Sequence, residues 1–164
     1  MKRTVPTTIT AVTLCFLALL TGVLTFAVQR SQPNAATRQW QPSEIIQPQE
    51  LIVRIRDNGA AKPLIISVAF PTLYRAGHIP GAVFGGPAST PAGLDALKRA
   101  VEKVPKDREI VIYCGCCPWE ACPNVRPAFD LLHQLGYSRV KSLVIPSNLE
   151  ADWTAKGYPL ETGQ

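Results

Sequence analysis

No acidic residue occurs in the first 43 positions of the chain, whereas Lys2, Arg3, Arg30 and Arg38 are basic. From Glu44 onward the sequence has 13 basic and 12 acidic residues, so the net charge of +5 arises almost entirely near the N-terminus. The chain also has no basic stripe interleaved with aromatic residues, which is the pattern typical of nucleic-acid-binding surfaces. The charge distribution therefore predicts no nucleic-acid partner and indicates an orientation relative to a membrane.

Charged residues are also missing from Ile9–Val28, an apolar run long enough to span a bilayer. The basic residues before it favour a cytoplasmic N-terminus, which predicts that the rest of the chain lies on the exported side. Residues 1–30 are therefore expected to be a signal anchor or a signal peptide. Thr25-Phe26-Ala27 is only a passable cleavage site, so two outcomes stay open: a membrane-anchored periplasmic or extracytoplasmic domain, or a secreted one.

The remainder of the chain has no internal repeats and divides into two parts. Residues 31–45 are rich in Gln, Pro, Ser and Asn, which predicts a flexible linker. Residues 46–162 alternate apolar strand patterns with amphipathic helix patterns, which predicts one α/β domain with a parallel sheet and helices on both faces. The expected strands are 64–70, a short one after 82, 109–113 and 140–145, and the expected helices are 49–58, 91–104, 124–135 and 149–156.

Four of the five cysteines lie in the ten residues 114–123, between the expected strand 109–113 and the expected helix 124–135. A loop that enters a helix directs main-chain N–H groups and the positive helix end toward its side chains. Such surroundings favour the thiolate, which is the reactive form of cysteine. Cys114 is therefore expected to have a lowered pKa and to act as a nucleophile.

The other three cysteines of the loop, Cys116, Cys117 and Cys122, have three possible roles. They could accept sulfur from Cys114 or form a disulfide with it, and Cys114-x-x-Cys117 has the spacing of redox motifs. They could instead form structural disulfides in an oxidising compartment. They could also join Cys114 as ligands of a soft metal such as Cu(I). Because thiol exchange is favoured, no metal and no cofactor is assigned.

Several segments resemble the rhodanese (sulfurtransferase) domain family. They include the turn Gly77-His78-Ile79-Pro80-Gly81-Ala82, the strand that ends in Tyr113-Cys114, and the helix end Leu135-Gly136-Tyr137. The C-terminal segment Trp153-Thr154-Ala155-Lys156-Gly157-Tyr158-Pro159 also matches. The resemblance implies a rhodanese-like fold, and it implies that Cys114 carries a persulfide.

The sequence departs from that family in two places. Ser67-Val68-Ala69 stands where the family usually has Asp-Val-Arg, so that charge pair is absent. The cysteine loop is about five residues longer than usual and carries Glu120 where a basic residue is common. Repulsion by Glu120 predicts poor use of the dianion thiosulfate, and Trp119, Glu120 and Arg126 are the residues expected to contact the substrate.

Together these features predict an exported or membrane-tethered domain that transfers persulfide sulfur or exchanges thiols and disulfides. Cys114 acts with Cys116, Cys117 or Cys122, and the partner is a small sulfur donor or a protein thiol or persulfide. The alternative is a non-enzymatic module that binds a soft metal or protects the thiols of a partner.

Overall fold

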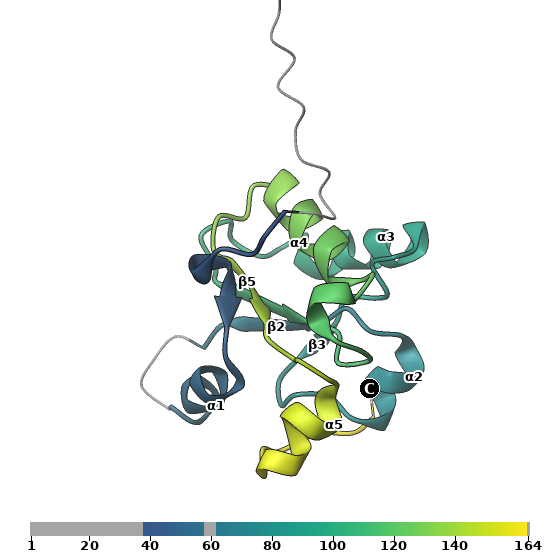
Figure 1. Cartoon of the computed structure of the whole chain (residues 1–164). Coiled ribbons are helices and arrows are strands. Elements are labelled where there is room, and N and C mark those ends of the chain that lie inside the picture. Colours follow the sequence, from purple (N-terminus) through teal and green to yellow (C-terminus); the bar gives the residue numbers. More distant parts are fainter. Residues whose placement is uncertain (1–37, 58–61, 164) are drawn as a thin grey trace, which may run out of the picture. The chain divides into compact units, whose positions relative to one another are not determined.

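A computed structural model describes residues 38–57 and 62–163 (Figure 1). The strands are β1 (Ile45–Ile46), β2 (Leu64–Ser67), β3 (Val83–Phe84), β4 (Ile110–Tyr113) and β5 (Val140–Leu143). The helices are α1 (Pro48–Arg56), α2 (Pro71–Ala76), α3 (Pro91–Val101), α4 (Val125–Gln134) and α5 (Leu149–Asp152). The described residues also form three short 3-10 helices, which are η2 (Pro42–Glu44), η3 (Trp119–Ala121) and η4 (Thr154–Lys156).

The five strands form one sheet in the order β1-β5-β4-β2-β3, and every pairing is parallel. Strand β4 lies in the middle, where Ile112 is paired with Ile66 on one side and with Ser142 on the other. This arrangement confirms the predicted α/β class and the parallel sheet. In open parallel sheets, ligands bind beyond the carboxyl ends of the strands, and Cys114 follows directly after β4.

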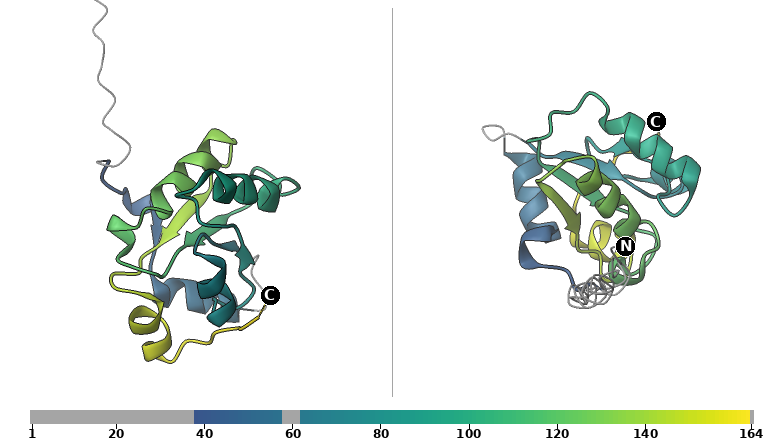
Figure 2. Two further views of the ribbon diagram at one scale, coloured as in Figure 1. Left: turned by 90° about the vertical axis from the view of Figure 1, so that its right-hand side faces the viewer. Right: turned by 90° about the horizontal axis from the view of Figure 1, so that it is seen from above.

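Two hydrophobic cores cover the two faces of the sheet, because successive side chains of a strand point to opposite faces. Ile110 and Ile112 of β4 belong to the core that includes residues of α3 and α4. Val111 and Tyr113 belong to the core that includes Leu51 of α1. All four β4 side chains are buried, which explains the continuous apolar run in the sequence. Figure 2 shows helices on both sides of the sheet.

The described fold begins earlier than the sequence predicts. Residues 42–45, expected to belong to the linker, form η2 and the start of β1, which pairs with β5 through Ile45 and Ser142. Trp40, also in the expected linker, packs edge-on against Phe129 of α4 with ring centroids 4.9 Å apart. A two-residue strand in Gln- and Pro-rich surroundings has no detectable period, which is why the sequence pattern did not indicate it.

The expected helix 149–156 is divided, because α5 ends at Asp152 and η4 follows it. Trp153 between them is fully buried, and its indole N–H donates to the carbonyl of Pro159. Within residues 38–57 and 62–163, no helix is long and apolar enough to cross a lipid bilayer. The predicted anchor or signal over residues 1–30 lies outside the described residues.

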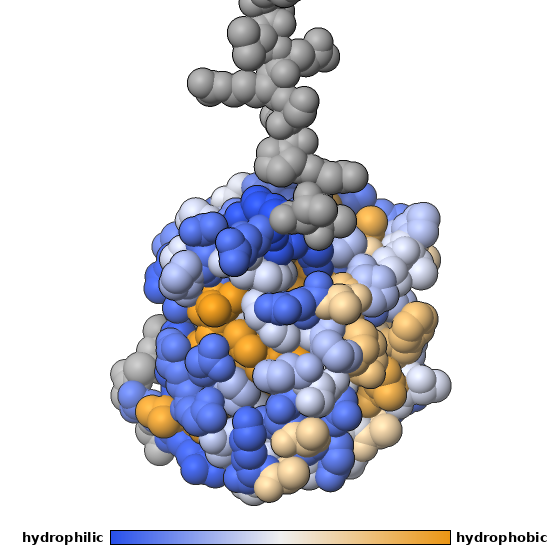
Figure 3. All heavy atoms as spheres, viewed as in Figure 1, coloured by the Kyte–Doolittle hydropathy of each residue, from blue (hydrophilic) through white to orange (hydrophobic). Residues whose placement is uncertain are grey.

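The surface of the domain is mostly hydrophilic on the face drawn in Figure 3, where apolar side chains gather in separate patches. Among the residues that the structure describes, the large apolar side chains that stay exposed are those of Val53, Phe70, Leu73 and Val83. Phe70 and Leu73 stand at the start of α2, and Leu73 is 44% exposed. Exposed apolar side chains of this kind can contact a binding partner.

Candidate active site

The cysteine loop starts where β4 ends and finishes where α4 begins. Cys114 is buried, and Gly115 turns the chain with φ of +77°. A side chain at Gly115 would be strained, and its Cβ would lie 2.9 Å from the Cβ of Leu149. The turn brings Cys116 back over Cys114, after which η3 carries the chain to Cys122 and α4. The glycine thereby allows thiols from both ends of the loop to meet.

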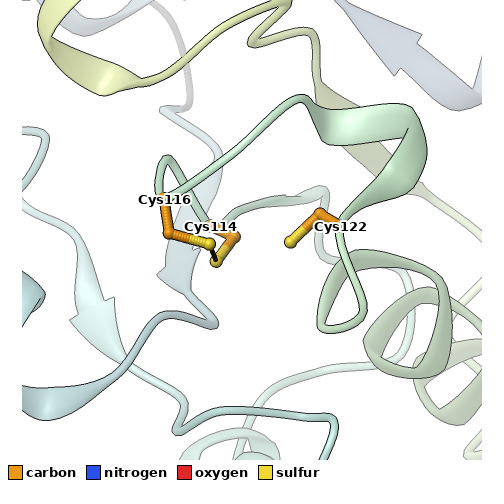
Figure 4. A group of neighbouring side chains, drawn as sticks. All are labelled: Cys114, Cys116 and Cys122. Atoms are coloured by element: carbon orange, nitrogen blue, oxygen red, sulfur yellow. Dashed lines mark hydrogen bonds between the residues drawn. The ribbon is translucent and has the colours of Figure 1, made fainter.

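Three of the four loop thiols form one group, which we call the thiol cluster: Cys114, Cys116 and Cys122. Their sulfur atoms all lie within 4.8 Å of one another. The Sγ atoms of Cys114 and Cys116 are 3.2 Å apart. Figure 4 shows these two side by side, with Cys122 pointing toward them from the segment that enters α4. Cys117 stands outside the cluster, although its Sγ lies 3.0 Å from that of Cys116.

Asn124 fixes the position of Cys114. Its side chain is fully buried, its Nδ2 donates to the Sγ of Cys114 at 3.4 Å, and its Oδ1 accepts from the backbone N–H of Ser89 at 2.9 Å. The amide therefore joins the loop before α3 to the thiol cluster at the start of α4. A role for Asn124 was not predicted from the sequence, where its only signal is its place at the start of the expected helix 124–135.

Among the cluster cysteines, Cys122 is the one whose pKa is lowered. The thiol of Cys114 donates to it and the main-chain N–H groups of Asn124 and Val125 face it, so its pKa is lowered to about 5 although burial opposes this. The pKa of Cys114 is raised, first because its proton is held in the bond to Cys122 and second because it is buried. The expected lowering of the Cys114 pKa is therefore wrong. The start of α4 lowers the pKa of a thiol, as expected. The thiol affected is that of Cys122, which these N–H groups face, and not that of Cys114.

This assignment predicts the order of alkylation of the reduced protein. At pH 7, iodoacetamide should modify Cys122 faster than Cys114, and the Cys122 rate should fall only below about pH 5. Cys117, whose pKa burial raises to about 12, should react slowly at neutral pH. The check is peptide mass spectrometry of time courses between pH 4 and pH 9. Faster modification of Cys114 than of Cys122 at pH 7 would contradict the assignment.

Different members of the thiol cluster line two separate pockets. The first, which we call the α2 pocket, has a volume of about 450 Å³ and is reached by Cys114 and Cys116 but not by Cys122. Ser67 and Ala69, the positions that depart from the family pattern, line it. Among the described residues that line it there is no Lys, Arg or His, and its one charged side chain is that of Glu150.

The second pocket, which we call the α4 pocket, has a volume of about 1270 Å³ and is reached by Cys122. All three residues expected to contact substrate, Trp119, Glu120 and Arg126, line this pocket and not the one that Cys114 reaches. Glu120 is exposed, so water screens its charge, and the expected repulsion of thiosulfate loses its support.

Arg126 is a half-buried cation in the wall of the α4 pocket. Its guanidinium lies 3.5 Å from the ring centroid of Trp40, and its Nη2 donates to the carbonyl of Arg38 at 2.9 Å. Its Nη1 is buried and has no partner within the described part of the chain. No salt bridge to Arg126 occurs there either, whereas Arg38 is paired with Glu44 at 2.8 Å. Trp40 and Arg38 are pocket residues that the sequence analysis assigned to a linker.

The sequence model of one protein family, the rhodanese-like domain, matches residues 47–144. No curated protein matches the chain significantly. Among solved structures, the Alr3790 protein from Anabaena is similar with 27% identity and a TM-score of 0.56, over 72% of this chain and 82% of that chain.

Two further solved structures share the fold at lower identity. The single-domain sulfurtransferase RDL2 from Saccharomyces cerevisiae has 18% identity and a TM-score of 0.53, over 74% of this chain and 100% of that chain. A variant of EanB in complex with hercynine has 22% identity and a TM-score of 0.52, over 80% of this chain and 29% of that chain.

Proposed function

The chain belongs to the rhodanese-like domain family, and on that premise we propose that it transfers persulfide sulfur through Cys114, Cys116 and Cys122. The observation that carries the proposal is the thiol cluster itself: three sulfur atoms within 4.8 Å of one another at the carboxyl end of the central strand. The cluster combines a thiolate that can attack a donor with neighbouring thiols that can take the sulfur onward. RDL2, which has the same fold, is itself a sulfurtransferase.

The first step is a displacement at the outer sulfur of a donor persulfide, R–S–SH. A thiolate of the cluster attacks that sulfur, a new S–S bond forms on the protein, and the bond within the donor breaks. The donor leaves as a thiolate and takes up a proton. No net oxidation occurs, because one S–S bond replaces another.

The second step has two outcomes that the cluster permits. An acceptor thiolate can attack the outer sulfur, which regenerates the protein thiolate and yields an acceptor persulfide. A neighbouring thiol of the cluster can instead attack the inner sulfur, which forms a protein disulfide and releases hydrosulfide. The second outcome reduces the sulfane sulfur and oxidises two thiols, and it makes the chain a thiol–disulfide exchanger.

The test is uptake of sulfur by the reduced, metal-free full chain under anaerobic conditions. Glutathione persulfide should add one sulfur atom to the peptide that holds the loop, as detected by mass spectrometry. The serine variant of each cluster cysteine should load or discharge more slowly, whereas Cys15→Ser, outside the loop, is the matched control. A wild type that takes up no sulfur and purifies with one soft metal ion per chain would contradict the proposal and favour the binding module.

We further propose that the domain acts outside the cytoplasm, tethered by residues 1–30 or released after their cleavage. Support comes from the uncharged run Ile9–Val28 and the basic residues before it. A phosphatase reporter that is active only after export, fused after Gln164, should be active in cells that express the full chain. Removal of residues 1–30 should abolish that activity, and a reporter active only in the cytoplasm would contradict the proposal.

A further inference from the structure

The thiol cluster separates two pockets that have different chemistry. Cys122 alone of the cluster reaches the α4 pocket, and Cys114 and Cys116 alone reach the α2 pocket. The sulfur atoms are nevertheless close enough for exchange between them, since all lie within 4.8 Å. A sulfur atom can therefore enter from one pocket and leave into the other without crossing solvent.

The α4 pocket suits an anionic donor. Arg38 and Arg126 line it, together with the carboxylates of Glu120 and Asp130. Arg38 is paired with Glu44, whereas Arg126 makes no salt bridge within the described residues and is the cation open to a ligand. Its Trp40 and Trp119 rings lie with centroids 5.3 Å apart and supply apolar contact area beside these cations. Small persulfides that carry a carboxylate would find both an ion-pair partner and a surface on which to pack.

The α2 pocket suits a neutral acceptor. It offers no cation to an anion, because no Lys, Arg or His of the described residues lines it. Its Leu73 side chain is 44% exposed, and Phe70 beside it is 47% exposed, so the rim is apolar. Cys116 is exposed at this pocket, which makes it the cluster thiol that a thiol on a peptide can reach.

Building on the function proposed above, we propose that sulfur crosses the cluster from one pocket to the other. An anionic low-molecular-weight persulfide in the α4 pocket loads Cys122, and Cys114 with Cys116 delivers the sulfur to a neutral peptide thiol in the α2 pocket. The inference rests on one observation: Cys122 lines the α4 pocket, whereas Cys114 and Cys116 line the α2 pocket.

The crossing step is balanced within the cluster. The sulfur of Cys114 or Cys116, as a thiolate, attacks the outer sulfur of the Cys122 persulfide, and the Cys122 Sγ–S bond breaks as the new S–S bond forms. Cys122 departs as a thiolate, which the donors facing it stabilise, and the proton released by the attacking thiol stays on the transferred persulfide or passes to water. The lowered Cys122 pKa favours this direction, because a thiol of lower pKa leaves faster.

Two exposed alanines provide a matched pair of variants. Ala121 on η3 lines the α4 pocket, and Ala76 at the end of α2 lines the α2 pocket. A tryptophan at either site would obstruct one pocket and leave every cysteine in place. Loading is measured as sulfur gained by the protein from glutathione persulfide, and discharge as sulfur gained by a neutral tripeptide with one cysteine. Thermal unfolding checks that both variants fold.

Ala121→Trp should slow loading at least about tenfold and leave discharge unchanged, because it blocks approach to Cys122. Ala76→Trp should do the reverse. Cys122→Ser should not load, whereas the double variant Cys114→Ser/Cys116→Ser should load and retain the sulfur. If both tryptophan variants slow the same step, or if Cys122→Ser loads normally, the proposal that sulfur passes from the α4 pocket to the α2 pocket is wrong. The proposed sulfur-transfer function would not be affected by that result. If the wild type does not load at all, the proposed function itself fails.

Discussion

Replacing Asn124 by aspartate (Asn124→Asp) is expected to slow sulfur loading at pH 7 at least about tenfold. The substitution keeps the oxygen that accepts from Ser89 and removes the Nδ2 donor that lies 3.4 Å from the Cys114 sulfur. A carboxylate about 4 Å from a thiolate costs about 4 kcal/mol at an effective dielectric constant of 20. That energy corresponds to about three pKa units, so both Cys114 and Cys122 should ionise less readily at neutral pH.

The matched control is Asn124→Ala, which removes both hydrogen bonds of the amide and adds no charge. It should destabilise the domain by about 1–3 kcal/mol, because the N–H of Ser89 loses its partner, but it should slow sulfur transfer much less than Asn124→Asp. Loading rates and the pH dependence of Cys122 alkylation are the measurements. In Asn124→Asp the alkylation curve should move above its starting point near pH 5. Equal rates for the two variants would contradict an electrostatic role for this position.

The largest effect on stability is expected for Gly93→Ala in α3. An added Cβ would lie 1.9 Å from the carbonyl oxygen of Pro87 and 2.4 Å from its carbonyl carbon. Both atoms belong to the backbone, so no side-chain rotation relieves the contact. Overpacking commonly costs 1–3 kcal/mol, and we expect about 3 kcal/mol or more here because the chain before α3 must move.

Gly136→Ala separates this steric cost from a conformational one. Gly136 has φ of +89° and nothing within 4 Å of its added Cβ, so only the left-handed backbone opposes a side chain. That variant should lose about 1–2 kcal/mol. The free energy of unfolding of the wild type and both variants is measured by urea unfolding. An m-value equal to that of the wild type indicates that the folded state of a variant is intact. A smaller loss for Gly93→Ala than for Gly136→Ala would show that the Pro87 contact yields easily.

The sequence was sufficient to predict the parts of the fold that have a strong period or a continuous apolar run. Leu64–Ser67, Ile110–Tyr113 and Val140–Leu143 are such strands, and their alternation with helices predicts the parallel sheet. The pair Ile45–Ile46 was missed because two residues carry no period. Its strand exists only because β5 offers a partner, and that partner lies about one hundred residues away along the chain.

The sequence predicted which residues form the site, but not which of the two pockets each residue lines. The cysteines and the helix that follows them were evident, and so was the stabilisation of a thiolate at the start of that helix. The identity of the thiol with the lowered pKa depends on the path of the loop, which places Cys122 beside the main-chain N–H groups of Asn124 and Val125. The same path directs Trp119, Glu120 and Arg126 to a different pocket from Cys114.

Strand β1 also determines how the protein can be shortened. It covers the outer edge of β5, so a fragment that starts at Gln47, where the family match begins, would leave β5 with unpaired N–H and C=O groups. Exposed strand edges pair with those of other chains, and such a fragment should self-associate. The two residues Ile45 and Ile46 thus occupy the edge of β5 with which a strand of another molecule could otherwise pair.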